Sequence, residues 1–375
     1  MARWHDVTVL TRANNEPAIR AAMAAGPEVP GLRFVYHDLA APLLRLKKQL
    51  GWHGLYYGRW QASARKVIAR MVRETHFDLL HHVTYAGARF PTAIFGHGVP
   101  AIWGPVGGFE PMPAEFLPWR YPRELAEELV RNTANALQEK TGALGRRAAA
   151  ASLPIVSTRE TAAALERAGV RSHLLPTIGI RLTDFTPAVV PPVDHLRLLF
   201  SGRLLYWKGV ELAIRALHAS GTTARLTLMG EGRFRKNAEA LVRELGLRDR
   251  VEFCGQVTRT EMLAAYAAYD ALLFPSLHDT GGFVLLEAMA TALPVICLAC
   301  AGPALAVPEG CGLPVPLGSR AEVIAGLAAA IRRYAEDPDL RRAHGAQARK
   351  HVGEHYEWDR KGEQMNAFYA EVLAT

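Results

Sequence analysis

Residues 274–295, FPSLHDTGGFVLLEAMATALPV, combine the end of a strand, a polar glycine loop and a helix in one unit. The apolar residues 271–274 stop at a proline, which predicts a buried parallel strand. From Phe283 onward, apolar residues recur at helical spacing until Pro294 ends the pattern. Asp279 therefore lies in the loop, and Glu287 lies one turn into the helix.

Two glycines, Gly281 and Gly282, open this predicted helix. Their amides allow an anion to approach closely, with the positive end of the helix dipole behind them. The stretch thus predicts a phosphate site with a carboxylate on either side. In the alternative interpretation, Asp279 is only a loop acid at a helix N-terminus and Glu287 is a solvated helix residue.

The chain after residue 187 alternates regularly between strands and helices. Residues 187–192 are proline-rich and predict a linker between two domains, 1–186 and 187–375, since 375 residues exceed one ordinary core. Alternation of this kind predicts a parallel, doubly wound sheet that binds ligands at the carboxyl ends of its strands. Beyond the opening stretch, strands are predicted over 196–201, 224–229, 251–254 and 295–298, and helices over 210–219, 233–245 and 259–268.

Charged residues and glycines follow two of these strands. The loop SGRLLYWKG contains Arg203 and Lys208, and the loop GEG contains Gly230 and Glu231. Cations and helix amides suit a diphosphate, while carboxylates suit hydroxyl groups. The loops together therefore predict a nucleoside diphosphate that carries a sugar. A dinucleotide is disfavoured, because the GEG loop lacks the third glycine of that fingerprint.

In the first half, the segment GPVGGFE over residues 104–110 has three glycines that permit close approach of a substrate. A plain turn is the alternative. Strands are predicted over 7–10, 32–36, 77–83, 101–103 and 155–157, and helices over 16–25, 124–150 and 160–169. The candidate acceptor-side residues are His82, Gly107, Gly108 and Glu110, although a histidine at a strand end is more often structural.

The net charge of +8 lies entirely in the first half. Residues 1–185 carry 23 Lys and Arg against 15 Asp and Glu, whereas the remainder carries 21 against 21. Residues 45–73 alone hold eight cations among the aromatic residues Trp52, Tyr56, Tyr57 and Trp60. This pattern predicts a surface for an anionic membrane or a lipid-linked acceptor. An ordinary amphipathic helix, with Val67, Ile68, Met71 and Val72 packed inward and the cations solvated, is the favoured alternative.

No uninterrupted apolar run is long enough to span a bilayer and no export signal precedes residue 7, so we expect a cytoplasmic protein, peripheral at the inner membrane face. Cys297 and Cys300 form a CxxC pair without a second ligand pair. Buried small thiols are therefore favoured over a metal or redox site, and no metal site is predicted.

The order of GRLLYWKG, LMGEG and HDTGGFVLLEAMA resembles the retaining, nucleotide-sugar-dependent glycosyltransferases of group 1, family 4-like, with the GT-B fold. Asp279 and Glu287 occupy the positions of that family's two signature acids, and GPVGG with the preceding HHVT resembles its acceptor half. The resemblance implies an α/β fold of two Rossmann-like domains, each with a doubly wound parallel sheet, that face each other across a cleft. It also implies that a final helix over 358–373 crosses back to the first domain.

The resemblance assigns roles to individual residues. It implies that Arg203 and Lys208 hold the diphosphate, Glu287 the ribose and Asp279 the transferred sugar. The remaining donor-site residues are Gly230, Glu231, Gly281 and Gly282. Asp279 replaces a Glu and Thr280 stands where the family often has Gly, which affects the sugar contact.

The implied reaction is transfer from a UDP- or GDP-sugar to a glycan, a lipid-linked or a small-molecule acceptor, without a metal, a cofactor or nucleic acid. No acid pair has the spacing of a double-displacement glycosidase. Two alternatives stay open, which are a sugar-nucleotide epimerase on the same fold and a donor-binding protein with impaired transfer.

Family members usually begin with a strand and a glycine-rich loop ahead of the strand predicted over 7–10. We therefore expect that the first strand is missing, and the alternative is a naturally short start with an incomplete acceptor side. Nucleotide binding with weak or no transfer is the expected consequence.

Overall fold

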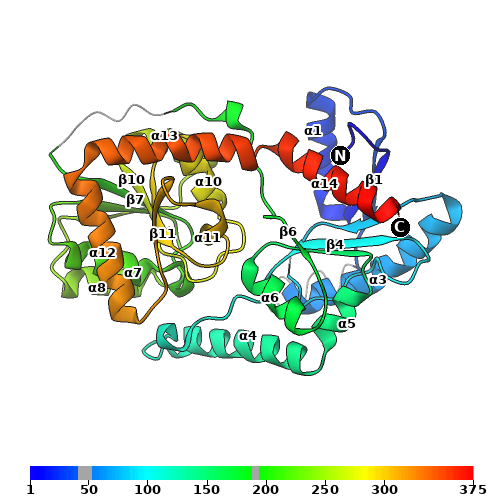
Figure 1. Ribbon diagram of the computed structural model, residues 1–375, viewed down its shortest axis with the longest axis horizontal. Coiled ribbons are helices and arrows are strands. Elements are labelled where there is room, and N and C mark those ends of the chain that lie inside the picture. The colour runs from blue at the N-terminus through cyan, green and yellow to red at the C-terminus, as the bar shows by residue number, and fades with distance from the viewer. Residues whose placement is uncertain (41–52, 86, 188–193, 375) are drawn as a thin grey trace.

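The computed structural model describes residues 1–40, 53–85, 87–187 and 194–374, which form two α/β halves. Figure 1 shows the C-terminal half on the left and the N-terminal half on the right, with α13 (Pro338–His355) along the top of the C-terminal half and α14 (Trp358–Leu373) beside the N-terminal half. The predicted α/β class with parallel sheets is confirmed.

The C-terminal half contains a six-stranded parallel sheet in the order β12-β11-β10-β7-β8-β9. Chain order reverses between β7 and β10, so this pair of strands is the switch point of the sheet. The strands are β7 (Arg197–Ser201), β8 (Arg225–Met229), β9 (Val251–Gly255), β10 (Ala271–Phe274), β11 (Val295–Leu298) and β12 (Gly312–Val315).

Helices cover this sheet, and apolar clusters lie on both of its faces. Burial on two sides explains why β7, β10 and β11 read as continuous apolar runs rather than as alternating patterns. The helices are α7 (Val210–Ser220), α8 (Arg235–Glu244), α9 (Arg259–Ala265), α10 (Phe283–Ala290), α11 (Pro303–Ala306) and α12 (Arg320–Glu336).

The N-terminal half distributes its parallel strands over two sheets. A four-stranded sheet follows chain order, β3 (Leu80–His82), β4 (Ala101–Val106), β5 (Leu153–Val156) and β6 (His173–Leu174). A separate parallel pair consists of β1 (Val7–Arg12) and β2 (Leu32–His37). The helices are α1 (Glu16–Ala25), α3 (His53–Glu74), α4 (Pro122–Lys140), α5 (Ala143–Ala149) and α6 (Arg159–Arg167).

The single helix predicted over 124–150 is wrong, because α4 ends at Lys140 and α5 begins at Ala143. Gly142 between them adopts a left-handed conformation with φ of 69°, which a continuous helix does not allow. The Arg146 guanidinium donates to the Thr141 carbonyl at 2.8 Å and satisfies one of the carbonyls at the break.

Three of the aromatic residues predicted for this surface, Tyr56, Tyr57 and Trp60, lie in α3, which begins at His53. Tyr56 and Trp60 share a buried face with Ala64 and Ile68, one helical turn apart each time. The exposed face of α3 carries the cations Arg59, Arg65, Lys66, Arg70 and Arg73. Arg45, Lys47, Lys48 and Trp52 lie outside the described residues.

The two halves share buried packing. Met112, Phe116 and Leu117, which follow β4, belong to the main apolar cluster of the C-terminal half, and the Tyr206 hydroxyl donates to the Phe116 carbonyl at 2.8 Å. The helix predicted over 358–373 coincides with α14, whose buried apolar side chains, Met365 and Val372, pack with strand residues of the N-terminal half. The predicted boundary at residue 186 stays a prediction.

Cys297 and Cys300 are buried thiols, as predicted. Burial raises the pKa of Cys300 to about 12 and also raises the pKa of Cys297. The Cys300 thiol donates to the carbonyls of Ser276 and Leu277 at 3.6 and 3.5 Å. In the part of the chain that the structure describes, the helices lack the combined length and apolarity needed to cross a bilayer.

Candidate functional site

The loops after β7 and β10 flank the switch point of the C-terminal sheet, where parallel α/β sheets bind ligands. Lys208 follows β7, Asp279 follows β10, and their side chains form an ion pair. The Lys208 ammonium lies 4.5 Å from the centre of the Trp207 ring, and its side chain is 18% exposed. The strand order therefore brings together two residues that the sequence predicted for one site.

Close backbone packing explains why Lys208 is followed by Gly209. Gly209 has φ of 77°, and a Cβ atom there would lie 1.9 Å from the Pro275 carbonyl oxygen. The loop after β7 thus presses directly on the end of β10. Arg203 of the same loop is exposed, and none of the described residues pairs with its guanidinium.

Asp279 is the anion that the glycine amides bind in this structure. Its Oδ1 accepts hydrogen bonds from the amides of Gly281 and Gly282 at 3.3 and 3.1 Å. Gly282 is the N-cap of α10 with φ of 65°, so the loop turns sharply at the helix start. One carboxylate therefore holds both the lysine and the amides predicted for a phosphate.

Glu287 is buried, with 4% of its surface exposed, so the alternative of a solvated helix residue is wrong. A buried carboxylate requires hydrogen-bond partners, and two side chains supply them here. Arg259 Nη1 lies 2.5 Å from Glu287 Oε1, and the Tyr266 hydroxyl donates to Oε2 at 3.1 Å. Burial, followed by the charge of Glu287, raises the pKa of Tyr266, so its hydroxyl stays protonated. The sequence reasoning missed both partners.

The GEG loop after β8 packs on its neighbour. A Cβ at Gly230, whose φ is 145°, would lie 2.0 Å from the Gly202 carbonyl oxygen. The Gly230 amide also donates to the Gly255 carbonyl at 2.7 Å, so this glycine joins the ends of three adjacent strands. The Glu231 side chain is exposed and pairs with Arg235, and its contact with a donor stays a prediction.

The GPVGG segment of the N-terminal half, whose first three residues end β4, reaches the loop after β10. A Cβ at Gly107 would lie 2.7 Å from Thr280 Cγ2 and 2.5 Å from Ser157 Oγ, so the Thr280 methyl group lies against Gly107. The two glycine loops that the sequence assigned to different domains therefore meet. A second contact joins the halves nearby, since the Ala301 amide donates to Glu160 at 2.8 Å.

Glu110 holds the shape of the GPVGG loop. Its buried carboxylate accepts from the Gly108 amide at 3.0 Å and from the Thr158 and Thr161 hydroxyls at 2.6 and 3.1 Å. Gly108 has φ of 102°, and its carbonyl accepts from Arg89 at 2.6 Å. These contacts support a structural role for both residues.

His82 contacts only residues of the N-terminal half among the polar groups described. Its ring nitrogens lie 3.0 Å from the Tyr57 hydroxyl and 2.6 Å from Thr92 Oγ1. Burial lowers the pKa of His82, so the ring is neutral near pH 7. Its role on the acceptor side stays a prediction.

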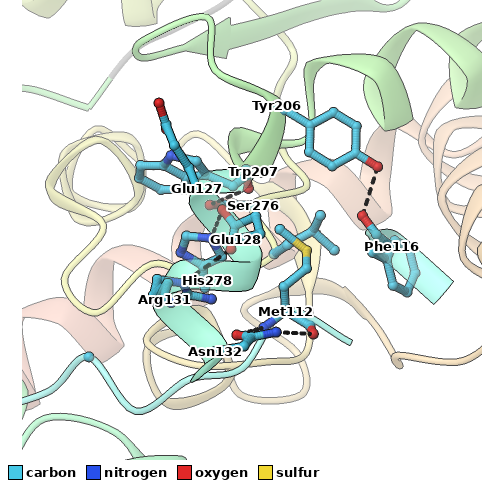
Figure 2. Close-up of polar contacts among 12 residues, drawn as sticks. Met112, Phe116, Glu127, Glu128, Arg131, Asn132, Tyr206, Trp207, Ser276 and His278 are labelled. Atoms are coloured by element: carbon cyan, nitrogen blue, oxygen red, sulfur yellow. Dashed lines mark hydrogen bonds and ion pairs between the residues drawn. The ribbon is translucent and has the colours of Figure 1, made fainter. Parts of the chain in front are cut away.

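A group beside the site was also missed. His278 stacks on Trp207 and contacts Glu128 of α4, as Figure 2 shows. Position was the only sequence signal for this group, because Trp207 directly precedes Lys208 and His278 directly precedes Asp279.

Comparison with known proteins gives a consistent result for the C-terminal half. Residues 185–351 match the family model described as glycosyl transferases group 1. The D-inositol 3-phosphate glycosyltransferase of Xylanimonas cellulosilytica is 34% identical over 176 residues, which cover 41% of this chain and 42% of that protein. The chain spans less than half the length of the curated relatives that it matches.

Solved structures extend the likeness to the whole fold. Sucrose-phosphate synthase from Thermosynechococcus elongatus has a TM-score of 0.67 at 22% identity, covering 98% of this chain and 89% of that chain. HepE of Anabaena, in complex with UDP and glucose, has a TM-score of 0.64 at 18% identity, covering 99% and 93%. The predicted GT-B fold is confirmed.

Proposed function

We propose that this chain, whose residues 185–351 carry the glycosyl transferases group 1 domain within a GT-B fold, is a glycosyltransferase. It transfers a sugar from a nucleoside diphosphate sugar, UDP- or GDP-linked, to an acceptor hydroxyl with retention of configuration. The observation that carries the proposal is the meeting of three loops at the switch point: Lys208 pairs with Asp279, and Gly107 lies against Thr280.

The diphosphate of the donor competes with Asp279 for the same groups. When it binds, its phosphate oxygens replace the Asp279 carboxylate as the partner of Lys208 and of the amides of Gly281 and Gly282. Asp279 is then released toward the hydroxyl groups of the sugar. Arg203, which is exposed at the same edge of the sheet, adds a second cation.

In the chemical step, the bond between the anomeric carbon and the diphosphate breaks, and the acceptor oxygen bonds to that carbon on the same face. The acceptor proton leaves with the diphosphate oxygen. Negative charge builds on the leaving group, where each well-placed cation or amide contributes about 3 to 4 kcal/mol. Because Lys208, Arg203 and the amides take up this charge, we propose that no metal is required.

The nucleoside side of the donor is assigned to Glu287. Its carboxylate sits behind Arg259, whose side chain is 65% exposed and therefore free to move when ribose hydroxyls arrive. The ligands of HepE, UDP and glucose, support a donor of this chemical class.

The acceptor is a glycan, a lipid-linked sugar or a small molecule bound by the N-terminal half. The cationic face of α3 supports a peripheral contact with an anionic membrane, because Arg59, Lys66, Arg70 and Arg73 recur along one side of the helix. Vesicle cosedimentation with and without anionic lipid tests this contact. Equal binding to neutral vesicles would contradict it.

The test of function mixes the protein with UDP-, GDP- and ADP-sugars and follows nucleotide release with and without candidate acceptors. Proton NMR of the product reports the anomeric configuration. We expect acceptor-dependent release, an unchanged anomer and full activity in EDTA. Release of free epimerised sugar would favour an epimerase. Nucleotide-sugar binding without nucleotide release would favour a donor-binding protein. Loss of transfer activity in EDTA would refute metal independence.

A further inference from the structure

Lys208 and Asp279, the predicted cation and carboxylate of the site, each directly follow a residue with an aromatic ring. These two rings, of Trp207 and His278, are stacked. The Trp207 and His278 rings lie 4.6 Å apart at an angle of 16°. The backbones of the two loops are also joined, since the Leu277 amide donates to the Trp207 carbonyl at 2.9 Å. The Lys208–Asp279 ion pair thus continues a contact that begins one residue earlier in both loops.

The His278 ring has a partner from the other half of the chain. Its Nε2 lies 3.1 Å from Glu128 Oε1 on α4, and the side chains are only 10% and 7% exposed. Arg131 Nε donates to the other oxygen of Glu128 at 3.1 Å. Figure 2 shows the side chains of Glu128, His278 and Trp207 close together.

The protonation states of Glu128 and His278 determine which of the two side chains donates their hydrogen bond. Although burial raises the pKa of Glu128, the hydrogen bond that His278 donates and the neighbouring Arg131 guanidinium outweigh it and lower that pKa. Burial lowers the pKa of His278, so at neutral pH an ionised carboxylate faces a neutral ring. An ionised carboxylate only accepts, so His278 Nε2 carries the proton and donates it.

We propose that Glu128 and His278 are positioning residues of the donor site: Glu128 fixes the His278 ring against Trp207 and so holds Asp279 beside Lys208 and the amides of Gly281 and Gly282. The role of the site itself rests on the proposed function. The N-terminal half thereby controls the geometry of a site whose other residues all follow residue 187.

Adjacent residues on α4 provide a matched control. Glu127 also joins the two halves, through Arg233, but it is 49% exposed at the side chain and, among the described residues, forms no hydrogen bond or ion pair with the loops after β7 and β10. We compare Glu128→Ala, Glu127→Ala, His278→Ala and the double variant Glu128→Ala with His278→Ala. Glu128→Gln retains an acceptor for the His278 ring and serves as the rescue.

The first measurement needs no nucleotide. Hydrogen exchange by mass spectrometry follows the peptide that contains the Gly281 and Gly282 amides, which Asp279 caps. We expect exchange at least about threefold faster in Glu128→Ala and in His278→Ala, and unchanged in Glu127→Ala. Unchanged exchange in Glu128→Ala, or equal acceleration in Glu127→Ala, overturns the proposal.

The second measurement is calorimetry with UDP and GDP. Loss of one buried hydrogen bond predicts about tenfold weaker binding for Glu128→Ala, recovery in Glu128→Gln, and wild-type binding for Glu127→Ala. If Glu128 acts through His278, the double variant is no weaker than either single variant, and additive losses overturn the proposal. A wild-type protein that binds neither nucleotide refutes the proposed function, while the exchange experiment still decides the positioning role.

Discussion

At the scale of single residues, Lys208 has the most distinct position. It is the only one of the two predicted phosphate-binding cations that already pairs with a carboxylate of the described chain, Asp279. Its ammonium lies over the Trp207 ring, which fixes its direction without neutralising its charge. The sequence identified Lys208 as a candidate from its place before a helix, but it did not show that Asp279 is its partner.

Under the proposed function, Lys208→Ala removes a cation from the departing diphosphate. We expect kcat/KM for the donor to fall about 100-fold, because leaving-group stabilisation is realised in the transition state. Steady-state kinetics with the best donor of the panel measures this effect. Lys350→Ala on α13, a lysine exposed at 66% of its side chain, serves as the control and keeps wild-type kinetics.

Glu287→Ala tests the ribose contact. Since such a contact is equally strong in the ground state and the transition state, donor KM should rise about tenfold while kcat changes little. Tyr266→Phe removes one hydrogen bond to the carboxylate and leaves Arg259 in place, so its KM should lie between those of wild type and Glu287→Ala. A large loss of kcat at constant KM would contradict the assigned role.

At the scale of elements, glycines set how closely the loops of adjacent strands pack. Gly209 and Gly221 flank α7 at its two ends, and both have left-handed backbones, with φ of 77° and 67°. They differ in space, because a Cβ at Gly209 would lie 1.9 Å from the Pro275 carbonyl oxygen whereas a Cβ at Gly221 meets nothing within 4 Å. The pair therefore separates backbone strain from loop packing.

Gly221→Ala should lower the free energy of unfolding by about 1 to 2 kcal/mol, the cost of a left-handed alanine. Gly209→Ala adds the clash with Pro275, so we expect a loss of about 3 kcal/mol or more and weaker nucleotide binding. Urea unfolding and calorimetry measure the two effects. Equal stability of both variants would show that the loops after β7 and β10 separate easily.

At the scale of the whole molecule, the junction between the halves contains a buried cation. Lys361 in α14 is 6% exposed, and its ammonium donates to the Pro176 carbonyl at 2.5 Å. The chain pairs here with the start of α14, since the Ile180 amide donates to Tyr356 at 2.8 Å and the Trp358 amide donates to Ile180 at 3.1 Å. Burial lowers the pKa of Lys361 to about 8.

This pKa predicts a pH-dependent stability. The ordinary value for lysine is 10.5, so between about pH 8 and that value the unfolded chain binds more protons than the folded protein. The contribution of Lys361 to stability therefore rises with pH through this window. Relative to Lys361→Met, wild type should gain about 2 kcal/mol in the free energy of unfolding from about pH 7.5 to about pH 9.5. Urea unfolding of both proteins at these pH values measures the difference, and a constant difference would contradict the assignment.

Local patterns in the chain predict much of the fold. The apolar run before Pro275 and the 3.6-residue spacing after Phe283 predicted β10 and α10 with nearly the observed bounds. The same reasoning failed over 124–150, where the helical composition on both sides of Gly142 hid a left-handed break. It also placed Tyr56 and Trp60 on a surface, because their burial depends on what packs against α3.

The sequence by itself determined which residues carry charge after each strand, because strands, turns and helix starts are set by neighbours a few positions apart. Only the tertiary structure decided which of these loops meet. The order β12-β11-β10-β7-β8-β9 places Lys208 beside Asp279, which lies 71 residues later in the chain. The packing of residues 112–117 into the main apolar cluster of the C-terminal half brings Glu128 to His278. Strand order and the docking of α4 depend on burial summed over the whole chain, and no local pattern contains that sum.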